Sequence, residues 1–248
     1  MGRSSRRGSL TYYRDDLALV HHLGFGFHAD GTAPGILALL EPVRGGIVLE
    51  LGCGSGLFTR HLVEAGYDVV ATDASPAMLA LARETAPGAD IRQLVLPDDS
   101  LPECDAVVSI GHVLSYLSDE AAVDRALDAA ADALRPGGVL ALDLCDLRYG
   151  GLRRDEPNSS RIADDWAIVT CFSLPRPNLF VREIAAFLRN DDGTWRRDDE
   201  RHENVLVDTA LVPALLAEHG VQARVAESFG DEELPDGLVA IVGHKADG

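Results

Sequence analysis

The sequence predicts a three-layer α/β fold in which helices cover both faces of a mostly parallel, seven-stranded sheet. Apolar runs of strand length alternate with segments of helical period between residues 46 and 144. The links between these segments are short, which implies parallel strands joined by right-handed crossovers. Hydrophobic residues make up 46% of the 248-residue chain and aromatic residues only 6%, so the core is built mainly from Ala, Leu and Val.

The first unit of this pattern is a strand, a glycine-rich loop and a helix. The apolar run at residues 46–51 leads directly into the glycine-rich residues 52–56. Phe58 and Leu62 then recur at helical spacing, and Gly66 sits where the C-cap of a helix is expected.

A second unit follows at once. Residues 68–72 form a strand that ends at Asp73, and Ser75 is placed to cap a helix whose first turn carries Pro76. The inward face of this helix is expected to carry Met78, Leu81 and Ala82.

The pattern continues to the end of the fifth strand. We expect a short strand near residues 91–96, another at residues 106–110, and a helix over residues 119–134. The Arg-Pro-Gly-Gly segment at residues 135–138 is expected to stop this helix and turn the chain into a strand at residues 139–144.

From about residue 150 the pattern changes, and we interpret residues 150–205 as an antiparallel β insertion. Three β-like stretches follow, including residues 180–189, a turn at residues 191–193 and a partner that begins at Trp195. The insertion follows the fifth strand of a domain that spans residues 41–248, and residues 1–40 are expected to form a helical lid.

Regular order resumes after the insertion. A helix around residues 212–216, closed by Gly220, precedes strands at residues 221–226 and 237–242. Pro213 removes one early hydrogen bond of this helix, which leaves its first residue open.

Charge and cysteine usage exclude several classes of partner. The chain has 22 Lys and Arg against 40 Asp and Glu, a formal charge of -18 that repels a phosphate backbone, so we expect no nucleic-acid partner. No apolar run is long enough for a signal-peptide core or a membrane span, and we expect a cytoplasmic protein with no membrane contact. The four cysteines are widely spaced, which predicts free thiols and no metal site.

Residues 48–56, Val-Leu-Glu-Leu-Gly-Cys-Gly-Ser-Gly, resemble motif I of the class I, Rossmann-like, S-adenosylmethionine-dependent methyltransferases. Glycines let the backbone approach a ligand, and the following helix offers free N–H donors. The spacing is GxGxG with Leu57 next, whereas GxGxxG would place its third glycine at that position. The resemblance covers residues 40–145 strongly and 205–245 loosely, and it implies that S-adenosylmethionine binds across the carboxyl ends of the sheet and leaves as S-adenosylhomocysteine.

The same resemblance implies a set of cofactor-binding residues. Asp73 falls where an acidic residue accepts hydrogen bonds from both ribose hydroxyls, although it could instead only cap the next helix. Tyr12 or Tyr13 of the lid would bind the carboxylate of the ligand, and the alternative for both is ordinary packing of an amphipathic helix. The other expected cofactor contacts are Glu50, Gly52, Cys53, Gly54, Gly56, Ala74, Met78, Leu96, Asp98 and Ile110.

One position departs from the family pattern. Many relatives carry an Asp directly after the third strand to hold the adenine amino group, whereas here the segment reads Gln93 to Asp99. Asp98, Asp99 or the backbone of Leu96 could take this role, and the alternative is an exposed acidic turn.

The segment after the fourth strand contains the candidate base, His112. Methyl transfer is an in-line displacement that needs a base only if the acceptor carries a proton, and the ordinary pKa of His suits that task. A hydrogen-bonded support is the alternative role. The Asn-Pro-Pro-Tyr-like motif of nucleic-acid N-methylating relatives is missing here. The expected acceptor contacts are Phe25, His28, Tyr116 and Trp166.

These observations predict an enzyme that transfers a methyl group to an oxygen or nitrogen of a small-molecule acceptor. One alternative is a non-catalytic module that binds S-adenosylmethionine and uses the insertion as a contact surface. Another is an NAD-dependent oxidoreductase, which would need a Tyr-x-x-x-Lys donor relay, yet Lys245 is the only lysine. Whether the chain is a monomer or a homodimer stays open.

Overall fold

The larger of two sheets is the predicted mixed sheet of seven strands, which confirms the fold class. The computed structural model describes residues 12–151 and 157–247, so the first eleven residues of the expected lid lie outside the described part. The strand order is β10-β11-β5-β4-β1-β2-β3, and only β11 runs antiparallel to its neighbours. The strands are β1 (Ile47–Leu51), β2 (Asp68–Asp73), β3 (Asp90–Gln93), β4 (Cys104–Ser109), β5 (Leu134–Cys145), β10 (Val221–Ala226) and β11 (Leu238–Lys245).

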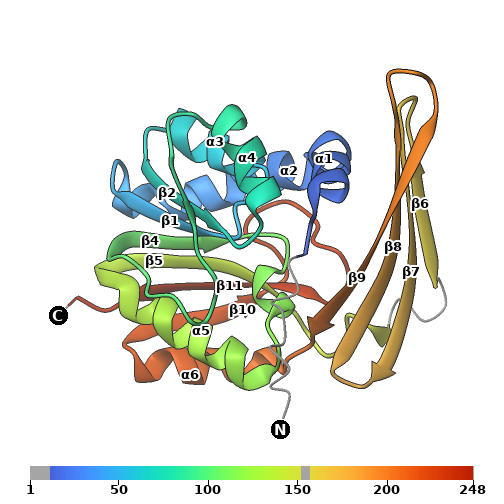
Figure 1. Ribbon diagram of the computed structural model, residues 1–248. Helices are drawn as coiled ribbons and strands as arrows, with labels where there is room; N and C mark the ends of the chain where they lie inside the picture. The colour runs from blue at the N-terminus through green and yellow to red at the C-terminus, as the bar shows by residue number, and fades with distance from the viewer. Residues whose placement is uncertain (1–11, 152–156, 248) are drawn as a thin grey trace, which may run out of the picture.

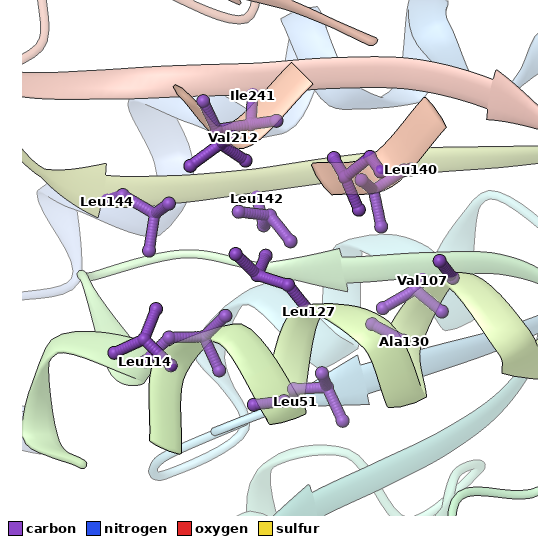
Figure 2. Packing of buried hydrophobic residues seen from close by; sticks show 14 of the residues in the cluster. Leu51, Val107, Leu114, Leu127, Ala130, Leu140, Leu142, Leu144, Val212 and Ile241 are labelled. Carbon is purple, nitrogen blue, oxygen red and sulfur yellow. The ribbon is translucent and has the colours of Figure 1, made fainter. Parts of the chain in front are cut away.

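Helices cover both faces of this sheet, because its central strands β1, β4 and β5 are buried on both sides and leave two apolar surfaces to fill. One face carries α2 (Phe27–Leu39), α3 (Leu57–Glu64) and α4 (Pro76–Thr85), as Figure 1 shows. The other face carries α5 (Glu120–Ala133) and α6 (Val212–Glu218), whose apolar stripes meet the Leu side chains of β5 (Figure 2). The strands between these helices are therefore held rigidly.

The local signals at the helix starts are confirmed. Ser75 caps α4, its Oγ accepting a hydrogen bond from the N–H of Met78 at 3.2 Å. The carboxylate of Asp119 caps α5 in the same way. Pro213 lies in the first turn of α6, where an N–H has no partner within the helix, so the expected loss of one hydrogen bond is wrong. Leu79, rather than the expected Leu81, joins Met78 and Ala82 as a buried residue of α4.

The Arg-Pro-Gly-Gly segment lies inside β5 rather than ahead of it. Leu134 already pairs with Cys104, and the regular register resumes where Val139 pairs with Ala106. Residues 135–138 therefore form an irregularity in the strand, and Gly137 takes a φ of 77° there. The third strand is also shorter than expected, and it ends at Gln93.

The second sheet is antiparallel and has four strands rather than three. They are β6 (Asn158–Ile162), β7 (Trp166–Arg176), β8 (Leu179–Arg189) and β9 (Trp195–Val205), in that order. The sequence analysis missed β6 because all five of its residues are exposed, so it lacks an apolar alternation. Figure 1 shows this sheet standing beside the larger one, with the β8–β9 hairpin extending away from it.

The two N-terminal helices have different neighbours. Helix α2 packs its buried Ala33 and Ile36 into the core of the larger sheet. Helix α1 (Asp15–Gly24) packs Leu17 and Val20 against β7 and β8 of the antiparallel sheet. Helix α1 thus joins the second sheet to the first. No helix within residues 12–151 and 157–247 is long and apolar enough to cross a membrane.

Candidate functional site

A cavity of about 860 Å³ lies between the carboxyl ends of the parallel strands and the inner face of the antiparallel sheet. The loops after β1 and β4 form one wall, and residues of α1 and of the first turns of α2 close another side. The carboxyl edge of a parallel sheet is where ligands of open α/β folds bind. The wall from the antiparallel sheet is made by Ser159, Ser160, Arg161, Ile168, Thr170, Phe172, Arg182 and Ile184.

The glycine loop after β1 is shaped by left-handed backbone conformations. Gly52 and Gly54 have φ values of 70° and 54°, which side-chain-bearing residues rarely adopt. A Cβ on Gly52 would also meet Val113 at 2.3 Å. A Cβ on Gly54 would approach nothing closer than the Sδ of Met78 at 4.0 Å, so the backbone there is open to a ligand.

Glu50 is a buried carboxyl at the floor of the cavity. It is only 1% exposed, and its Oε2 accepts a 2.6 Å hydrogen bond from the hydroxyl of Thr59. Burial raises its pKa to about 7, against the opposing effect of the Thr59 bond. Among the residues that the structure describes, no cationic side chain forms an ion pair with it, so the ionised form of Glu50 has no compensating charge.

Asp73 ends β2 and clamps the glycine loop. Its two carboxylate oxygens accept hydrogen bonds from the N–H of Gly54 at 2.9 Å and from the N–H of Ser75 at 2.8 Å. Burial raises its pKa, although these backbone bonds oppose the change. The hydroxyl of Ser75 in turn donates to the carbonyl of Tyr13 at 2.7 Å, which ties the N-terminal segment to α4.

The turn after β4 is held by Asp143 from the neighbouring strand β5. Gly111 and His112 both have positive φ, 85° and 52°, so their N–H groups point to the same side. The carboxylate of Asp143 accepts from them at 2.8 and 2.6 Å. Burial raises the pKa of Asp143 to about 7 despite these bonds. His112 is thereby fixed in a conformation that costs energy for a residue with a side chain.

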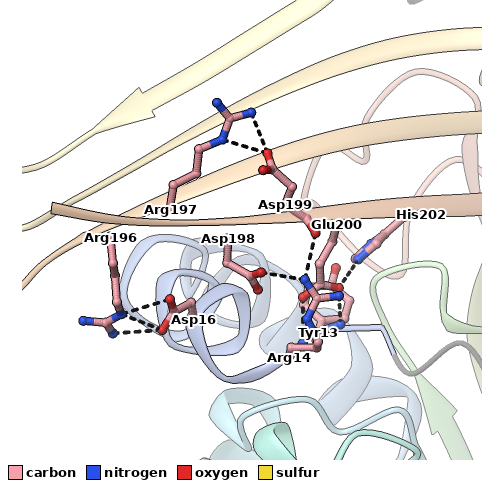
Figure 3. Close-up of polar contacts among 9 residues, drawn as sticks. All are labelled: Tyr13, Arg14, Asp16, Arg196, Arg197, Asp198, Asp199, Glu200 and His202. Carbon is pink, nitrogen blue, oxygen red and sulfur yellow. Dashed lines mark hydrogen bonds and ion pairs between the residues drawn. The ribbon is translucent and has the colours of Figure 1, made fainter.

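A polar network joins the N-terminal segment to the antiparallel sheet (Figure 3). Glu200 on β9 accepts from the N–H of Tyr13 at 2.8 Å, the N–H of Arg14 at 2.7 Å and the ring of His202 at 2.9 Å. Burial alone would raise the pKa of Glu200, but these bonds outweigh it and hold the pKa below the ordinary value. Burial lowers the pKa of His202, which favours its neutral form.

A second chain of contacts leads from this network into the cavity. The hydroxyl of Tyr13 bonds to that of Tyr116 at 2.9 Å, and the guanidinium of Arg182 donates to the same Tyr116 oxygen. The Tyr116 ring stacks on His112 with a centroid separation of 5.6 Å. Tyr116 therefore contacts all three of His112, Tyr13 and Arg182.

The structure brings half of the expected site residues to the cavity. Those that line it are Tyr13, Phe25, His28, Glu50, Gly52, Cys53, Gly54, Ile110 and His112. Their binding roles stay predictions.

The other expected site residues lie outside the lining. Gly56 packs against Ala82, and Ala74 and Asp98 are exposed. Trp166 packs on Gly24 at the end of α1, which is core packing rather than the expected position against an acceptor. The remaining residues outside the lining are Tyr12, Asp73, Met78, Leu96 and Tyr116.

Several lining residues were missed from the sequence; of the three described here, two carried a signal. Arg182 occupies the inward phase of β8, between Phe180 and Ile184, where an apolar residue is expected. Asp143 interrupts an otherwise apolar strand. His21 gave no signal, since it lies on an ordinary amphipathic helix; its burial lowers its pKa to about 3. Among the described residues no group of three or more His, Cys, Asp and Glu could hold a metal ion.

Residues 48–138 match the family model of a methyltransferase domain. A protein of Geobacillus sp. (strain WCH70) classed with the methyltransferases is 26% identical over 192 residues, which are 75% of this chain and 78% of that protein. The dTDP-3-amino-3,6-dideoxy-α-D-glucopyranose N,N-dimethyltransferase of Streptomyces fradiae is 26% identical over 146 residues, which are 56% of this chain and 57% of that enzyme.

The solved structure of the sugar N-methyltransferase KedS8 from Streptoalloteichus sp. aligns with a TM-score of 0.78 at 23% identity, over 100% of this chain and 98% of that one. At this identity the likeness concerns the fold. Together with the family model and the relatives, it supports the predicted class I S-adenosylmethionine-dependent methyltransferase family. The predicted family, enzyme class and cofactor are thereby confirmed.

Proposed function

We propose that this enzyme transfers the methyl group of S-adenosylmethionine to an oxygen or nitrogen atom of a small molecule bound in the cavity. The observation that carries the proposal is the two-sided cavity. One side is the glycine loop with Glu50, and the other is the antiparallel sheet, with His112 between them. A cavity of about 860 Å³ suits two small ligands held together rather than a polymer.

The residues of the glycine-loop side fit the cofactor. S-adenosylmethionine supplies an electrophilic methyl group on a sulfonium and also carries an ammonium group. Glu50 and Asp143 are buried carboxyls without an ion-pair partner among the described residues, and a cationic ligand would stabilise their ionised forms. Glu50 and the open backbone at Gly54 are the expected contacts of the amino-acid end.

Asp73 is proposed to accept the ribose hydroxyls. Its carboxylate oxygens each hold one backbone N–H and keep a lone pair for a further donor. The clamp on Gly54 means that the same side chain would fix the loop and the nucleoside together. Met78, next to Gly54, is the proposed neighbour of the adenine.

His112 is proposed to accept the proton of the acceptor. Its backbone is fixed by Asp143, its ring stacks on Tyr116, and it lines the cavity. The chain's own contribution is then alignment, exclusion of water and removal of one proton. The names of the Streptomyces fradiae relative and of KedS8 indicate amino-sugar nitrogen as one acceptor class to test.

The first test is isothermal titration with S-adenosylhomocysteine, with NADH as the control ligand. We expect the former to bind and the latter not to bind. A second assay then measures transfer of a labelled methyl group to amino sugars, sugar nucleotides and phenols, to find which class is the acceptor. Binding of NADH alone would refute the proposal; binding of S-adenosylhomocysteine without transfer to any of these small molecules would count against the acceptor class.

A further inference from the structure

Arg182 is a half-buried cation whose Nε atom is buried. It lies on β8 in the phase that faces the cavity, opposite Phe172 of β7 and His202 of β9. Its guanidinium donates to the hydroxyl of Tyr116 and lies 5.4 Å from the centre of that ring. Within residues 12–151 and 157–247 no carboxylate comes within ion-pair distance of Arg182.

The Nε–H group of Arg182 has no hydrogen-bond acceptor among the described residues, although it is buried. A guanidinium stays charged in proteins and offers five N–H donors in a fixed plane. Taking part of such a group out of water without an anion is unfavourable, because the charge loses hydration that no counterion replaces. The site is therefore electrostatically incomplete in the protein alone.

The surroundings of Arg182 belong to the acceptor side of the cavity. Thr170 and Ile184 of the same wall lie next to it, and Thr170 adds a hydroxyl donor. The glycine loop, where the cofactor is proposed to bind, forms the facing wall and carries its own buried carboxyl, Glu50. The positive charge of Arg182 is thus available to a second ligand, as is that of Arg161 on the same wall.

We propose that Arg182 binds an anionic group, a carboxylate or a phosphate, of the methyl acceptor. This rests on the proposed function, since it assigns the charge of the acceptor in the same site. The planar pair of Nε–H and an Nη–H presents a bidentate donor to either anion, while the Tyr116 hydroxyl takes a further N–H. The acceptor would be held by this group at the antiparallel sheet, with its nucleophilic atom toward His112.

The experiment measures anion binding to the complex with S-adenosylhomocysteine, using inorganic phosphate as the probe and chloride at equal ionic strength as the blank. Arg182→Met keeps the length and removes the charge. We expect it to weaken phosphate binding roughly 10- to 100-fold, the loss of charge-assisted hydrogen bonds, and to leave S-adenosylhomocysteine affinity within about twofold. Arg182→Lys should retain part of the phosphate affinity.

Arg189→Met is the matched control, because Arg189 lies on the same strand, is exposed and pairs with Asp165. It should change neither affinity. Thermal unfolding checks that each variant is folded, and removal of an unpaired, half-buried charge should not lower stability.

Two results would overturn the proposal. One is equal phosphate binding by wild type and Arg182→Met. The other is a tenfold loss of S-adenosylhomocysteine affinity in Arg182→Met with unchanged binding of 5′-methylthioadenosine, which lacks the amino-acid end, because Arg182 would then bind the carboxylate of the cofactor. If wild type fails to bind S-adenosylhomocysteine, the proposed function fails instead, and phosphate titration of the free protein still examines Arg182.

Discussion

The two walls of the cavity are built in different ways. The glycine-loop wall comes from one contiguous segment, in which Asp73 bonds to Gly54 across only 19 residues. The antiparallel wall depends on contacts between distant segments, such as Glu200 with Tyr13 across 187 residues. The first wall is also covered by helices on both faces of its sheet, whereas the second is joined to it through α1 (Figure 1).

The geometry of the glycine-loop wall can therefore vary separately from that of the antiparallel wall. A local motif fixes the glycine loop in one conformation through backbone bonds of Asp73 and Ser75. The antiparallel wall is fixed by a few polar groups, so a change at Glu200 or Arg182 would alter it without disturbing the loop. The predictions below examine the independence of the two walls.

The largest effect is expected for Asp73→Ala. The variant loses the proposed ribose contact and the clamp on Gly54, so we expect S-adenosylhomocysteine affinity to fall at least about 100-fold by calorimetry. Asp68→Ala, at the exposed start of the same strand, is the control and should bind normally. Unchanged affinity in Asp73→Ala would show that the ribose assignment is wrong.

Glu200→Gln is expected to destabilise the antiparallel wall and to leave the glycine-loop wall unchanged. Loss of the charge that accepts three buried donors should lower the free energy of unfolding by about 2 kcal/mol. The comparison is Glu203→Gln on the same strand, whose ion pair with Arg201 is largely exposed and should cost less than about 1 kcal/mol. Chemical denaturation measures both. Equal effects of the two substitutions would contradict the role given to Glu200.

The pH dependence of stability provides a second measurement of this network. The pKa of Glu200 lies below its ordinary value, so its stabilisation is present at neutral pH and is lost as pH falls through the folded-state pKa. His202 acts in the same direction, because burial lowers its pKa and protonation disfavours the folded state. Wild type should therefore lose stability on acidification more steeply than Glu200→Gln.

Two glycine substitutions test the contact between α1 and the antiparallel sheet. A Cβ at Gly24 would lie 2.5 Å from the ring of Trp166, so Gly24→Ala should lower stability by about 1–3 kcal/mol. A Cβ at Gly31 of α2 meets nothing within 4 Å, and Gly31→Ala should raise stability by about 0.5–1 kcal/mol through helix propensity. Thermal unfolding without ligand measures both, and a neutral Gly24→Ala would mean that Trp166 moves freely.

The last expected effect is a pH dependence of cofactor binding. The raised pKa values of Glu50 and Asp143, both about 7, mean that the free protein keeps these protons up to neutral pH and loses folded-state stability as pH rises through 7. An ammonium ligand favours ionised carboxylates, so S-adenosylhomocysteine affinity should rise about 10-fold from pH 6 to 8. Glu50→Gln should flatten this rise, and 5′-methylthioadenosine should show none. A parallel rise for both ligands would argue against an ammonium contact.

Much of the first wall could be predicted from the sequence. The strand before Gly52, the cap at Ser75 and the position of Asp73 depend on neighbouring residues, so local spacing locates them. Strand β6 could not be found, because its exposed residues carry no apolar period. The role of Trp166 could not be assigned either. An aromatic side chain can pack in a hydrophobic core or contact a ligand, and its neighbours in the folded chain decide which.

The sequence by itself determined the α/β class, the glycine loop and the family, because these follow from short-range periodicity and from a contiguous motif. Only the tertiary structure decided which side chains face the cavity. Arg182 is an unexpected charged residue at an inward position of its strand. Its proposed role depends on its contact with Tyr116, 66 residues away, and on the lack of a nearby carboxylate among the described residues. Burial and charge compensation are properties of the assembled chain, since they depend on every segment that packs around a group.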